Sequence, residues 1–437
     1  MISLRNLFYG PPTPPDFDPN NPREVRRNFR LAVSNGVLFI LADSLTDPTL
    51  VLVAFLSMLT DSPFLLGLIV PIQSAAWALP QIFVSGRLQS WPVKLDLYRR
   101  MSLVRIASWL MLALTINFVR DPHWAVLAFF VAFSIASLAS GIAGLPFLEV
   151  ISKTIPPNRR GEVFAWRLGL GGLLGIGGSF LVRWMVGENA PLPFPSNFGL
   201  LAFLFFVLSS ISLVVYNQIR EEPDRTPSPR RTTQQQVRAA LAELRENANY
   251  RRLLVAQSLY TMAASATPFF AVYVQGTLGG SRDWVGVYLG VMMVTNLLAN
   301  LLFGWLSRRA GNQRVLLVAL SAGGLMSLAV LTLALLAGPL GLSPLAASIW
   351  LAPVFFLSAL RNTGVAVSSS SLVMNIAPDE KRSLLIGFNQ TFLGVVMLMN
   401  GLSGLVVGWL GLPVLVGFTL LAHLGALFLI LGVHERH

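Results

Sequence analysis

The sequence predicts an all-α integral membrane protein in which twelve transmembrane helices form two pseudo-symmetric six-helix bundles. Three observations support this prediction. The composition is apolar, since 54% of the 437 residues are hydrophobic and only 12% are charged, whereas about 25% of the residues of a soluble domain are charged. The apolar residues gather in runs long enough to cross a bilayer. The two halves of the chain also share local sequence patterns at a nearly constant spacing.

Twelve apolar runs of about 20 residues, the length that crosses roughly 30 Å of hydrocarbon, follow one another along the chain. We expect one transmembrane helix in each run. The runs lie near residues 31–58, 64–86, 101–119, 124–150, 162–186, 197–217, 252–276, 284–306, 314–337, 346–373, 384–409 and 412–433. An even number of crossings places both termini on the same side of the membrane.

The basic residues lie unevenly on the two sides of this topology. Most of the 32 Lys and Arg residues lie in the tails and in the loops after even-numbered runs, and the exceptions are Arg120, Arg183 and Arg282 on the opposite side and Arg167 and Arg361 inside runs. Because cytoplasmic loops carry an excess of Lys and Arg, we expect both termini in the cytoplasm of a bacterial-type inner membrane. The net charge of +12 therefore needs no nucleic-acid partner, and the basic residues lack the interleaved aromatic pattern of a nucleic-acid groove.

The chain consists of two copies of one six-helix unit. Local matches recur at shifts of 218 to 222 residues. They pair Pro48 with Pro268, Gly86 with Gly304 and Arg160 with Arg382. We expect a disordered cytoplasmic tail (1–30), a first bundle (31–217), a charged cytoplasmic linker that ends in an amphipathic helix (218–251), a second bundle (252–433) and a short cytoplasmic tail (434–437).

The loop after the eighth run carries a recognisable motif. Its sequence "GWLSRRAGNQRVL" resembles the cytoplasmic signature Gly, x, Leu, x, Asp, Arg, x, Gly, Arg, Arg of the major facilitator superfamily. The residues that fit or nearly fit are Gly304, Leu306, Arg309, Gly311 and Arg314, while Arg308 stands where the family usually has Asp. Gly86 and Leu88 keep the motif in the first half, where Ser90 takes the Asp position. In the family, these loops latch the cytoplasmic side in one conformation.

The resemblance to this superfamily implies a fold and an activity. Its members are secondary transporters, in which two bundles related by parallel repeats expose a site near the membrane midplane alternately to each side. In the family, the first, fourth, seventh and tenth spans line the cavity. The polar residues of the corresponding runs are therefore the candidate site.

Two carboxylates lie inside the first run, in the stretch "FILADSLTDPTLVLV". An Asp at the centre of a spanning helix costs roughly 2.5 to 3.5 kcal/mol, whereas each large apolar residue returns about 0.3 to 0.6 kcal/mol. Asp43 and Asp47 are therefore expected to face a cavity or a partner. Four residues apart on one helix they would share a face, and ionising both there would be unfavourable. This arrangement is typical of a proton-coupled carrier.

The sequence duplication separates the two carboxylates. Asp47 precedes Pro48 as Thr267 precedes Pro268, and Asp or Thr before Pro is a favoured helix start. Asp47 therefore has an alternative interpretation as a cap that restarts a broken helix. Asp43 aligns with an alanine and has no shared structural role, so we prefer it as the coupling residue.

Arg361 lies in the middle of the tenth run, too deep to reach the interface easily. It needs a carboxylate, carbonyl groups or a substrate as its partner. The family resemblance brings it towards the acids of the first span, so it is either their counter-ion or the anchor of an anionic substrate group. Ser358, Asn362 and Ser369 could continue a polar stripe, although a single serine often bonds only to its own helix.

Other polar residues are assigned more simply. Gln257, Tyr260 and Thr261 of the seventh run fit a cavity face, with ordinary bonding between helices as the alternative. Glu149 and Lys153, four residues apart at the end of the fourth run, are interpreted as a local ion pair.

Several classes of function find no support in the sequence. There is no Walker loop for nucleotide binding, no metal-ligand cluster and no nucleophile elbow, and the chain has no cysteine. We therefore expect no enzymatic activity, no cofactor and no bound metal.

The sequence as a whole predicts a proton-coupled secondary transporter, a monomer in the lipid bilayer that moves a small molecule. Few charges are expected in the cavity, so efflux of a lipophilic neutral or cationic compound is preferred. The first alternative is import of an organic anion held by Arg361. The second is a membrane scaffold or lipid-handling protein that does not transport.

Overall fold

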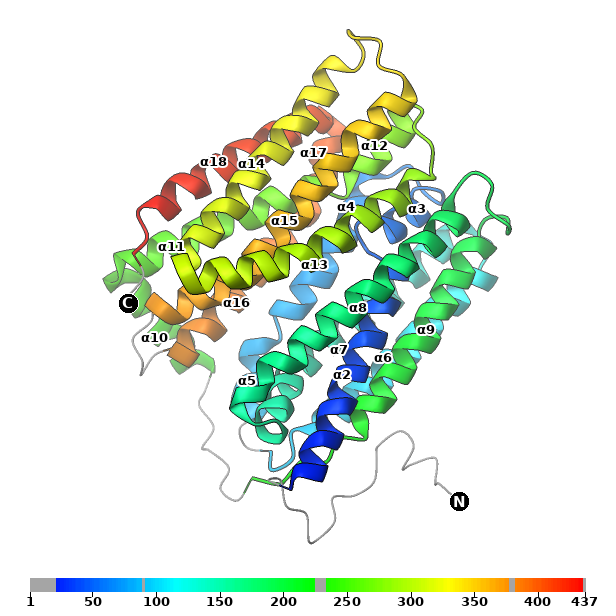
Figure 1. The fold of residues 1–437 in the computed structure, drawn as a ribbon. Helices are drawn as coiled ribbons and strands as arrows, with labels where there is room; N and C mark the ends of the chain where they lie inside the picture. Colours follow the sequence, from blue (N-terminus) through cyan, green and yellow to red (C-terminus); the bar gives the residue numbers. More distant parts are fainter. Residues whose placement is uncertain (1–20, 89–90, 225–232, 377–381, 435–437) are drawn as a thin grey trace. The chain divides into compact units, whose positions relative to one another are not determined.

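The computed structural model describes residues 21–88, 91–224, 233–376 and 382–434, and in these ranges every regular element is a helix (Figure 1). Nine helices of this described part are long and apolar enough to cross a membrane. They are α6 (Leu95–Phe118), α7 (Pro122–Thr154), α8 (Pro157–Val186), α9 (Ser196–Asn217), α13 (Trp284–Ala310), α14 (Asn312–Leu336), α15 (Pro344–Ile376), the continuous stretch Leu384–Leu410 and α18 (Leu412–Leu431). The all-α membrane fold is thus confirmed.

Three of the predicted spans are interrupted at a proline, so the count of twelve crossings stays a prediction. The first run forms α2 (Pro22–Leu45) and α3 (Val51–Leu56), and the second forms α4 (Pro63–Ala78) and α5 (Gln81–Leu88). The seventh forms α11 (Ala248–Met262), the short helix η1 (Ala263–Ala266) and α12 (Phe269–Thr277). Each interruption contains a proline, which has no N–H group for the helix ladder.

The interruptions of the first and seventh spans fall at aligned positions. Pro48 lies between α2 and α3, and Pro268 lies between η1 and α12. The eleventh run is also divided, into α16 (Arg382–Met399), η3 (Asn400–Leu402) and α17 (Ser403–Leu410). The two halves of the chain thus share a broken first helix, as their aligned sequences suggest.

Contacts divide the chain into two compact units. Unit 1 holds the described residues up to Thr46, those of 76–178 and those of 192–233, and unit 2 holds 47–75, 179–191 and the described residues after 233. This division differs from the predicted boundary at the linker, because two segments of the first half pack within unit 2. A Cβ on Gly404 in α17 would lie 2.2 Å from the carbonyl oxygen of Pro63 in α4, so these two backbones are in direct contact.

Unit 1 is built around an aromatic core. In it, α6 packs against α7 and α9, and α2 packs against α9. The rings of Tyr98 and Tyr216 lie 4.5 Å apart between their centroids, and Phe147 lies beside Tyr216 at 5.1 Å. This core holds α2, α6, α7 and α9 side by side.

Unit 2 is organised around two helices. Here α15 packs against α13 and α14, and α18 packs against α14 and α11. Tyr250, Leu253, Leu320 and Leu372 are fully buried in its main hydrophobic cluster. Their packing fixes the positions of α11 and α15, the two helices that carry most of the predicted site residues.

The first helix begins earlier than the predicted boundary between the N-terminal tail and the first bundle. α2 begins at Pro22, with the side chain of Asn21 accepting a hydrogen bond from the Arg23 amide at 3.0 Å. Residues 22–30, which we expected in a disordered tail, are therefore helical, and residues 1–20 lie outside the described part. The helix expected at the end of the linker is α10 (Thr233–Glu246).

Candidate functional site

The candidate site lies in unit 2, where α11 is interrupted. A helix end leaves carbonyl oxygens without partners in the same helix. Two side chains from other helices donate to carbonyls of the last turn of α11. The Nη2 group of Arg361 donates to the oxygen of Tyr260, and the Nδ2 group of Asn400 donates to the oxygen of Thr261 at 2.9 Å. The end of α11 is thus stabilised by polar side chains from α15 and from η3, the short helix that divides the eleventh span.

Arg361 is a buried positive charge. Its side chain lies in the middle of α15 and the residue is only 5% exposed. Its Nη1 group donates to Oδ1 of Asn362 at 2.8 Å, and its Nε group has no hydrogen-bond partner. Among the described residues of unit 2, it forms no ion pair with a carboxylate. The sequence suggested a carboxylate, carbonyl groups or a substrate as the partner of Arg361, and in the structure the guanidinium donates to a carbonyl group.

A second group of polar side chains joins α11 to α15 one to two turns away. The Nε2 group of Gln257 donates to Oγ of Ser369 at 2.8 Å, and the hydroxyl of Tyr260 donates to the same oxygen at 2.9 Å. The Oε1 atom of Gln257 is buried without a partner. These contacts bring together Gln257, Tyr260 and Ser369 and are hydrogen bonds between helices, the alternative given for the seventh run, so a role in lining a cavity stays a prediction.

The remaining predicted residues of α15 differ in their surroundings. Ser358 is buried one turn before Arg361, whereas Asn362 is exposed. On α16, Oδ1 of Asn389 is buried without a partner. The sequence analysis did not single out Asn400, although a polar residue inside the eleventh apolar run was a usable signal.

The polar cluster that joins α11 to α15 contains buried groups that can still form hydrogen bonds. It leaves one donor, Nε of Arg361, and one acceptor, Oε1 of Gln257, unsatisfied. Each such group costs about 1 to 3 kcal/mol when it stays unpaired, and native proteins keep few of them. A bound solute would remove this cost. In the described part of the chain, no group of three or more acidic or His residues could hold a metal ion.

The two carboxylates of the first span do not share a helix face. α2 ends at Leu45, so the predicted arrangement of Asp43 and Asp47 is wrong because the helix breaks between them. The Oδ1 atom of Asp47 accepts hydrogen bonds from the amides of Thr49 at 3.0 Å and Leu50 at 2.8 Å, which is the geometry of a cap. Asp43 stays in the helix and its side chain is exposed. α12 starts without a side-chain cap, so the seventh span does not repeat this device.

Unit 1 contains a buried arginine that the sequence analysis missed. Arg105 of α6 is 6% exposed, and its guanidinium carbon lies 4.7 Å from the ring centre of Trp109 and 5.2 Å from that of Phe39. Its charge interacts with that of Asp43. The predicted topology places Arg105 with the cytoplasmic basic residues, although it falls inside the third apolar run. That position was the signal that a charge is buried there.

A further arginine of unit 1 joins α8 to α2. Nη1 of Arg167 donates to the carbonyl of Ala32 at 2.7 Å and to Oδ1 of Asn35 at 2.9 Å. The Nδ2 group of Asn35 donates in turn to the hydroxyl of Ser212 on α9 at 2.8 Å. Arg167 therefore holds neighbouring helices together.

A family model described as the Major Facilitator Superfamily matches residues 32–400. The chain belongs to the Major Facilitator Superfamily. No curated protein sequence matches it.

Solved transporter structures share the fold of this superfamily member. A mutant of the nucleoside transporter NupG is 14% identical, with a TM-score of 0.70 over 93% of this chain and 100% of the other. A D-xylose-proton symporter is 15% identical, with a TM-score of 0.67 over 94% and 98% of the two chains. An inward-facing bacterial homologue of the iron transporter ferroportin is also 15% identical, with a TM-score of 0.65 over 94% and 99%. At these identities the likeness concerns the fold alone.

The superfamily signature in the second half forms the end of α13 and the start of α14. Gly304, Leu306 and Arg309 lie in α13, Arg314 lies in α14, and Gly311 alone connects the two helices with a positive φ of 83°. Leu306 packs against a small hydrophobic cluster, while the guanidinium of Arg309 lies 4.8 Å from the ring centre of Trp305. In the first half, Gly86 and Leu88 end α5. The latch role of these residues stays a prediction.

The first half of this superfamily member carries an ionic cluster near the same loop. The side chain of Glu221, which follows α9, is fully buried. Its carboxylate accepts hydrogen bonds from the amides of Lys94 at 3.0 Å and Leu95 at 2.7 Å, at the start of α6, and from Nζ of Lys153 at 2.6 Å. A residue of the linker thus caps α6 and pairs with the end of α7.

This cluster corrects the predicted pair of Glu149 and Lys153. The ammonium group of Lys153 pairs instead with Glu221 and with Asp224 at 2.8 Å, and Asp224 also pairs with Lys94 at 3.0 Å. Glu149 is exposed. Burial alone would raise the pKa of the Asp224 carboxyl, but the hydrogen bonds and charges of the two lysines outweigh it and hold the pKa below its ordinary value.

Proposed function

We propose that the protein is a secondary transporter that moves a small polar solute by alternating access, and that the solute presents an acidic or strongly accepting group to Arg361. The observation that carries this proposal is the buried guanidinium with an unpaired Nε group. Planar guanidinium donors suit carboxylate and phosphate oxygens, and hydrogen bonds to charged groups are about twice as strong as neutral ones.

The charge of Arg361 bears on the choice between the substrates that the sequence left open. A cationic solute would be repelled by a guanidinium that no carboxylate among the described residues of unit 2 neutralises, and this repulsion grows in a medium of low dielectric constant. An anionic group would instead stabilise the buried charge. This argument supports transport of an organic acid over transport of the lipophilic cation preferred from the sequence.

The test is a screen for solutes that stabilise the purified protein against thermal unfolding. A ligand that binds the folded state raises its stability, by about 2.7 kcal/mol at 100 times its Kd. We expect acidic solutes to raise the melting temperature of the wild type, to act more weakly on Arg361→Lys and to have no effect on Arg361→Met. Arg282→Met, at an exposed arginine, is the matched control and should respond as the wild type does.

Two results would contradict the proposal. If cationic solutes stabilised the wild type and Arg361→Met equally, Arg361 would not bind the substrate. If no solute of any charge had an effect, the scaffold alternative would be favoured, because a protein that binds no small molecule should not respond.

Proton coupling is the second part of the proposal and rests on Asp43. Asp43 is exposed, within one turn of the end of α2, and the charge of Arg105 acts on it; coupling requires that this exposed carboxylate faces water rather than lipid. In liposomes with an imposed pH gradient, Asp43→Asn should abolish gradient-driven accumulation while counterflow of solute continues. Asp61→Asn, at an exposed carboxylate, should accumulate solute normally. Unchanged accumulation in Asp43→Asn would remove Asp43 from the mechanism.

A further inference from the structure

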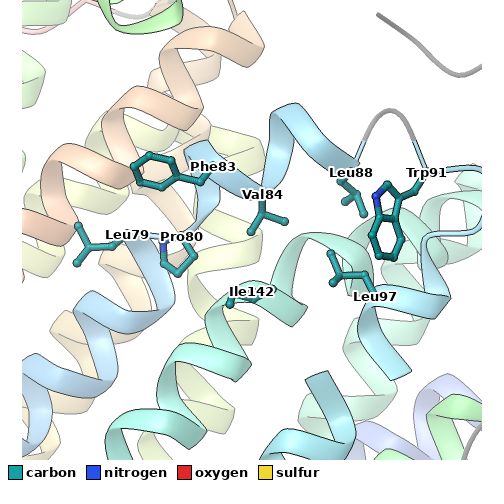
Figure 2. Close-up of a pocket in the computed structure, with 8 residues that line it drawn as sticks. All are labelled: Leu79, Pro80, Phe83, Val84, Leu88, Trp91, Leu97 and Ile142. Carbon is teal, nitrogen blue, oxygen red and sulfur yellow. The ribbon is translucent and has the colours of Figure 1, made fainter. Parts of the chain in front are cut away.

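Unit 1 contains an apolar groove that the proposed transport site does not use. Figure 2 shows the eight residues that line it. They are Leu79, Pro80, Phe83, Val84, Leu88, Trp91, Leu97 and Ile142. Its volume is about 470 Å³, and its lining offers no charged side chain. Such a space needs an apolar occupant, because an apolar cavity does not hold ordered water well.

The groove results from the interruption of the second span. α4 and α7 touch at Gly141, where a Cβ would lie 1.9 Å from the carbonyl oxygen of Ala76. Beyond this contact, α4 ends at Ala78, and the chain turns at Leu79 and Pro80 before α5 begins. The groove opens after this turn, between α5, the start of α6 and Ile142 of α7 (Figure 2).

One end of the groove carries a positive charge. The guanidinium carbon of Arg100 lies 5.3 Å from the ring centre of Trp91, and the side chain of Arg100 is exposed. Among the described side chains, two other positive charges near this end are already paired. Arg99 pairs with Asp96 at 3.3 Å, and the buried ammonium of Lys94 donates to two carbonyls and pairs with a carboxylate.

We propose that this groove binds one acyl chain of an anionic phospholipid of the surrounding bilayer, with the lipid phosphate on Arg100. A methylene group is about as large as a water molecule, roughly 30 Å³, so the groove holds on the order of fifteen of them, about one acyl chain. The position fits as well, because Trp91 lies just after the second predicted span and Trp is enriched at the membrane interface. An exposed arginine beside an apolar groove complements a lipid that joins an anionic head to an apolar tail.

The predicted orientation places this end of the groove on the cytoplasmic side. The cytoplasmic leaflet is the one that carries anionic lipids, and basic side chains at its surface attract them. A lipid held there would lie against α5, which ends with Gly86 and Leu88 of the superfamily motif. The proposal does not depend on the solute site, which lies in unit 2.

The test is native mass spectrometry of the full chain, released from detergent with phosphatidylglycerol or with phosphatidylcholine. We expect the wild type to retain phosphatidylglycerol in preference to phosphatidylcholine. Val84→Trp fills the groove and should abolish this retention. Arg100→Ala removes only the charge and should weaken phosphatidylglycerol binding about fivefold, the usual contribution of one basic residue at an anionic surface.

Two matched controls separate the groove from general effects of the substitutions. Val131→Trp is the same change at a valine of α7 that is 42% exposed and does not line the groove, and Arg120→Ala removes an exposed arginine elsewhere. Both should retain phosphatidylglycerol as the wild type does. Arg100→Ala alters an exposed position, so it keeps the proposal testable if Val84→Trp does not fold.

Three results would overturn the proposal. Retention of phosphatidylglycerol by Val84→Trp would show that the groove holds no acyl chain. Equal retention of the two lipids by the wild type and by Arg100→Ala would show that the headgroup is not recognised. If Val84→Trp kept its lipid but lost stabilisation by a lipophilic solute, the groove would be a solute site. None of these results bears on Arg361, whose own variants test the transport proposal.

Discussion

Replacing Glu221 with alanine should destabilise the protein strongly, although this residue lies in a linker. The substitution removes the acceptor of two backbone amides at the start of α6 and one of the partners of Lys153. Loss of a helix cap costs about 0.5 to 2 kcal/mol. Removing one partner of a buried ion pair costs about 3 to 5 kcal/mol, but Lys153 keeps Asp224, which reduces this part. We therefore expect a total loss of about 2 to 4 kcal/mol.

The assay is thermal unfolding of the purified protein in detergent, followed by tryptophan fluorescence. At about 2 to 4 °C per kcal/mol for a unit of this size, Glu221→Ala should lower the melting temperature by roughly 5 to 15 °C. Glu149→Ala is the matched control, because the local spacing suggests that Glu149 pairs with Lys153 whereas the structure leaves it exposed. Exposed substitutions usually change stability by less than about 0.5 kcal/mol. A melting temperature that falls for Glu149→Ala and not for Glu221→Ala would refute the reasoning.

Three further predictions concern unit 1. Gly141→Ala should lower the melting temperature, because the new Cβ would lie 1.9 Å from the carbonyl oxygen of Ala76. Overpacking of this kind lowers the free energy of unfolding by about 1 to 3 kcal/mol. An unchanged melting temperature would contradict the close contact between the helices. Asp224→Asn should destabilise the protein at neutral pH and not in acid. A carboxyl with a lowered pKa stabilises the fold above the ordinary Asp pKa of about 4, and this contribution is lost as the pH falls through the lowered value. Melting curves from pH 7 to pH 3 measure the difference in melting temperature between the variant and the wild type, and a difference that stays constant with pH would argue against this role of Asp224. Arg105→Gln should slow solute flux driven by a pH gradient in liposomes while counterflow persists, because it removes the charge that acts on Asp43; normal accumulation would exclude Arg105 from coupling.

Most of the fold was predictable because the bilayer imposes a length and a polarity on each crossing. Every apolar run found in the sequence contains one helix or a series of two or three helical segments. The break in the first span was also readable, since Pro48 aligns with Pro268 at the break in the seventh. The start of α2 at Pro22 was not predicted, because the polar residues before the first run were read as disordered although Asn21 and Pro22 form a regular helix start.

The site was predicted only in part, because local spacing does not reveal partners from distant segments. Lys153 has Glu149 one turn before it in the sequence, yet it pairs with Glu221, 68 residues away. The pairing of Arg361 with the carbonyl of Tyr260 depends on the exact end of α11, which the apolar pattern does not define. Arg105 was not predicted as a site residue, although its position inside an apolar run indicates a buried charge.

The breaks in the first and seventh spans are stabilised by side chains of opposite charge, Asp47 in the first span and Arg361 in the seventh. In the first span, the break is stabilised from within by the carboxylate of Asp47, which caps the following turn. In the seventh span, the break is stabilised from outside by Arg361 and Asn400. A solute that binds the guanidinium would compete with the carbonyl of Tyr260 for it, so under our proposal binding and the geometry of the break are linked. The rate of amide hydrogen exchange in the last turn of α11 should then change when an acidic solute binds. If the solute left this rate unchanged, solute binding and the geometry of the break would not be linked.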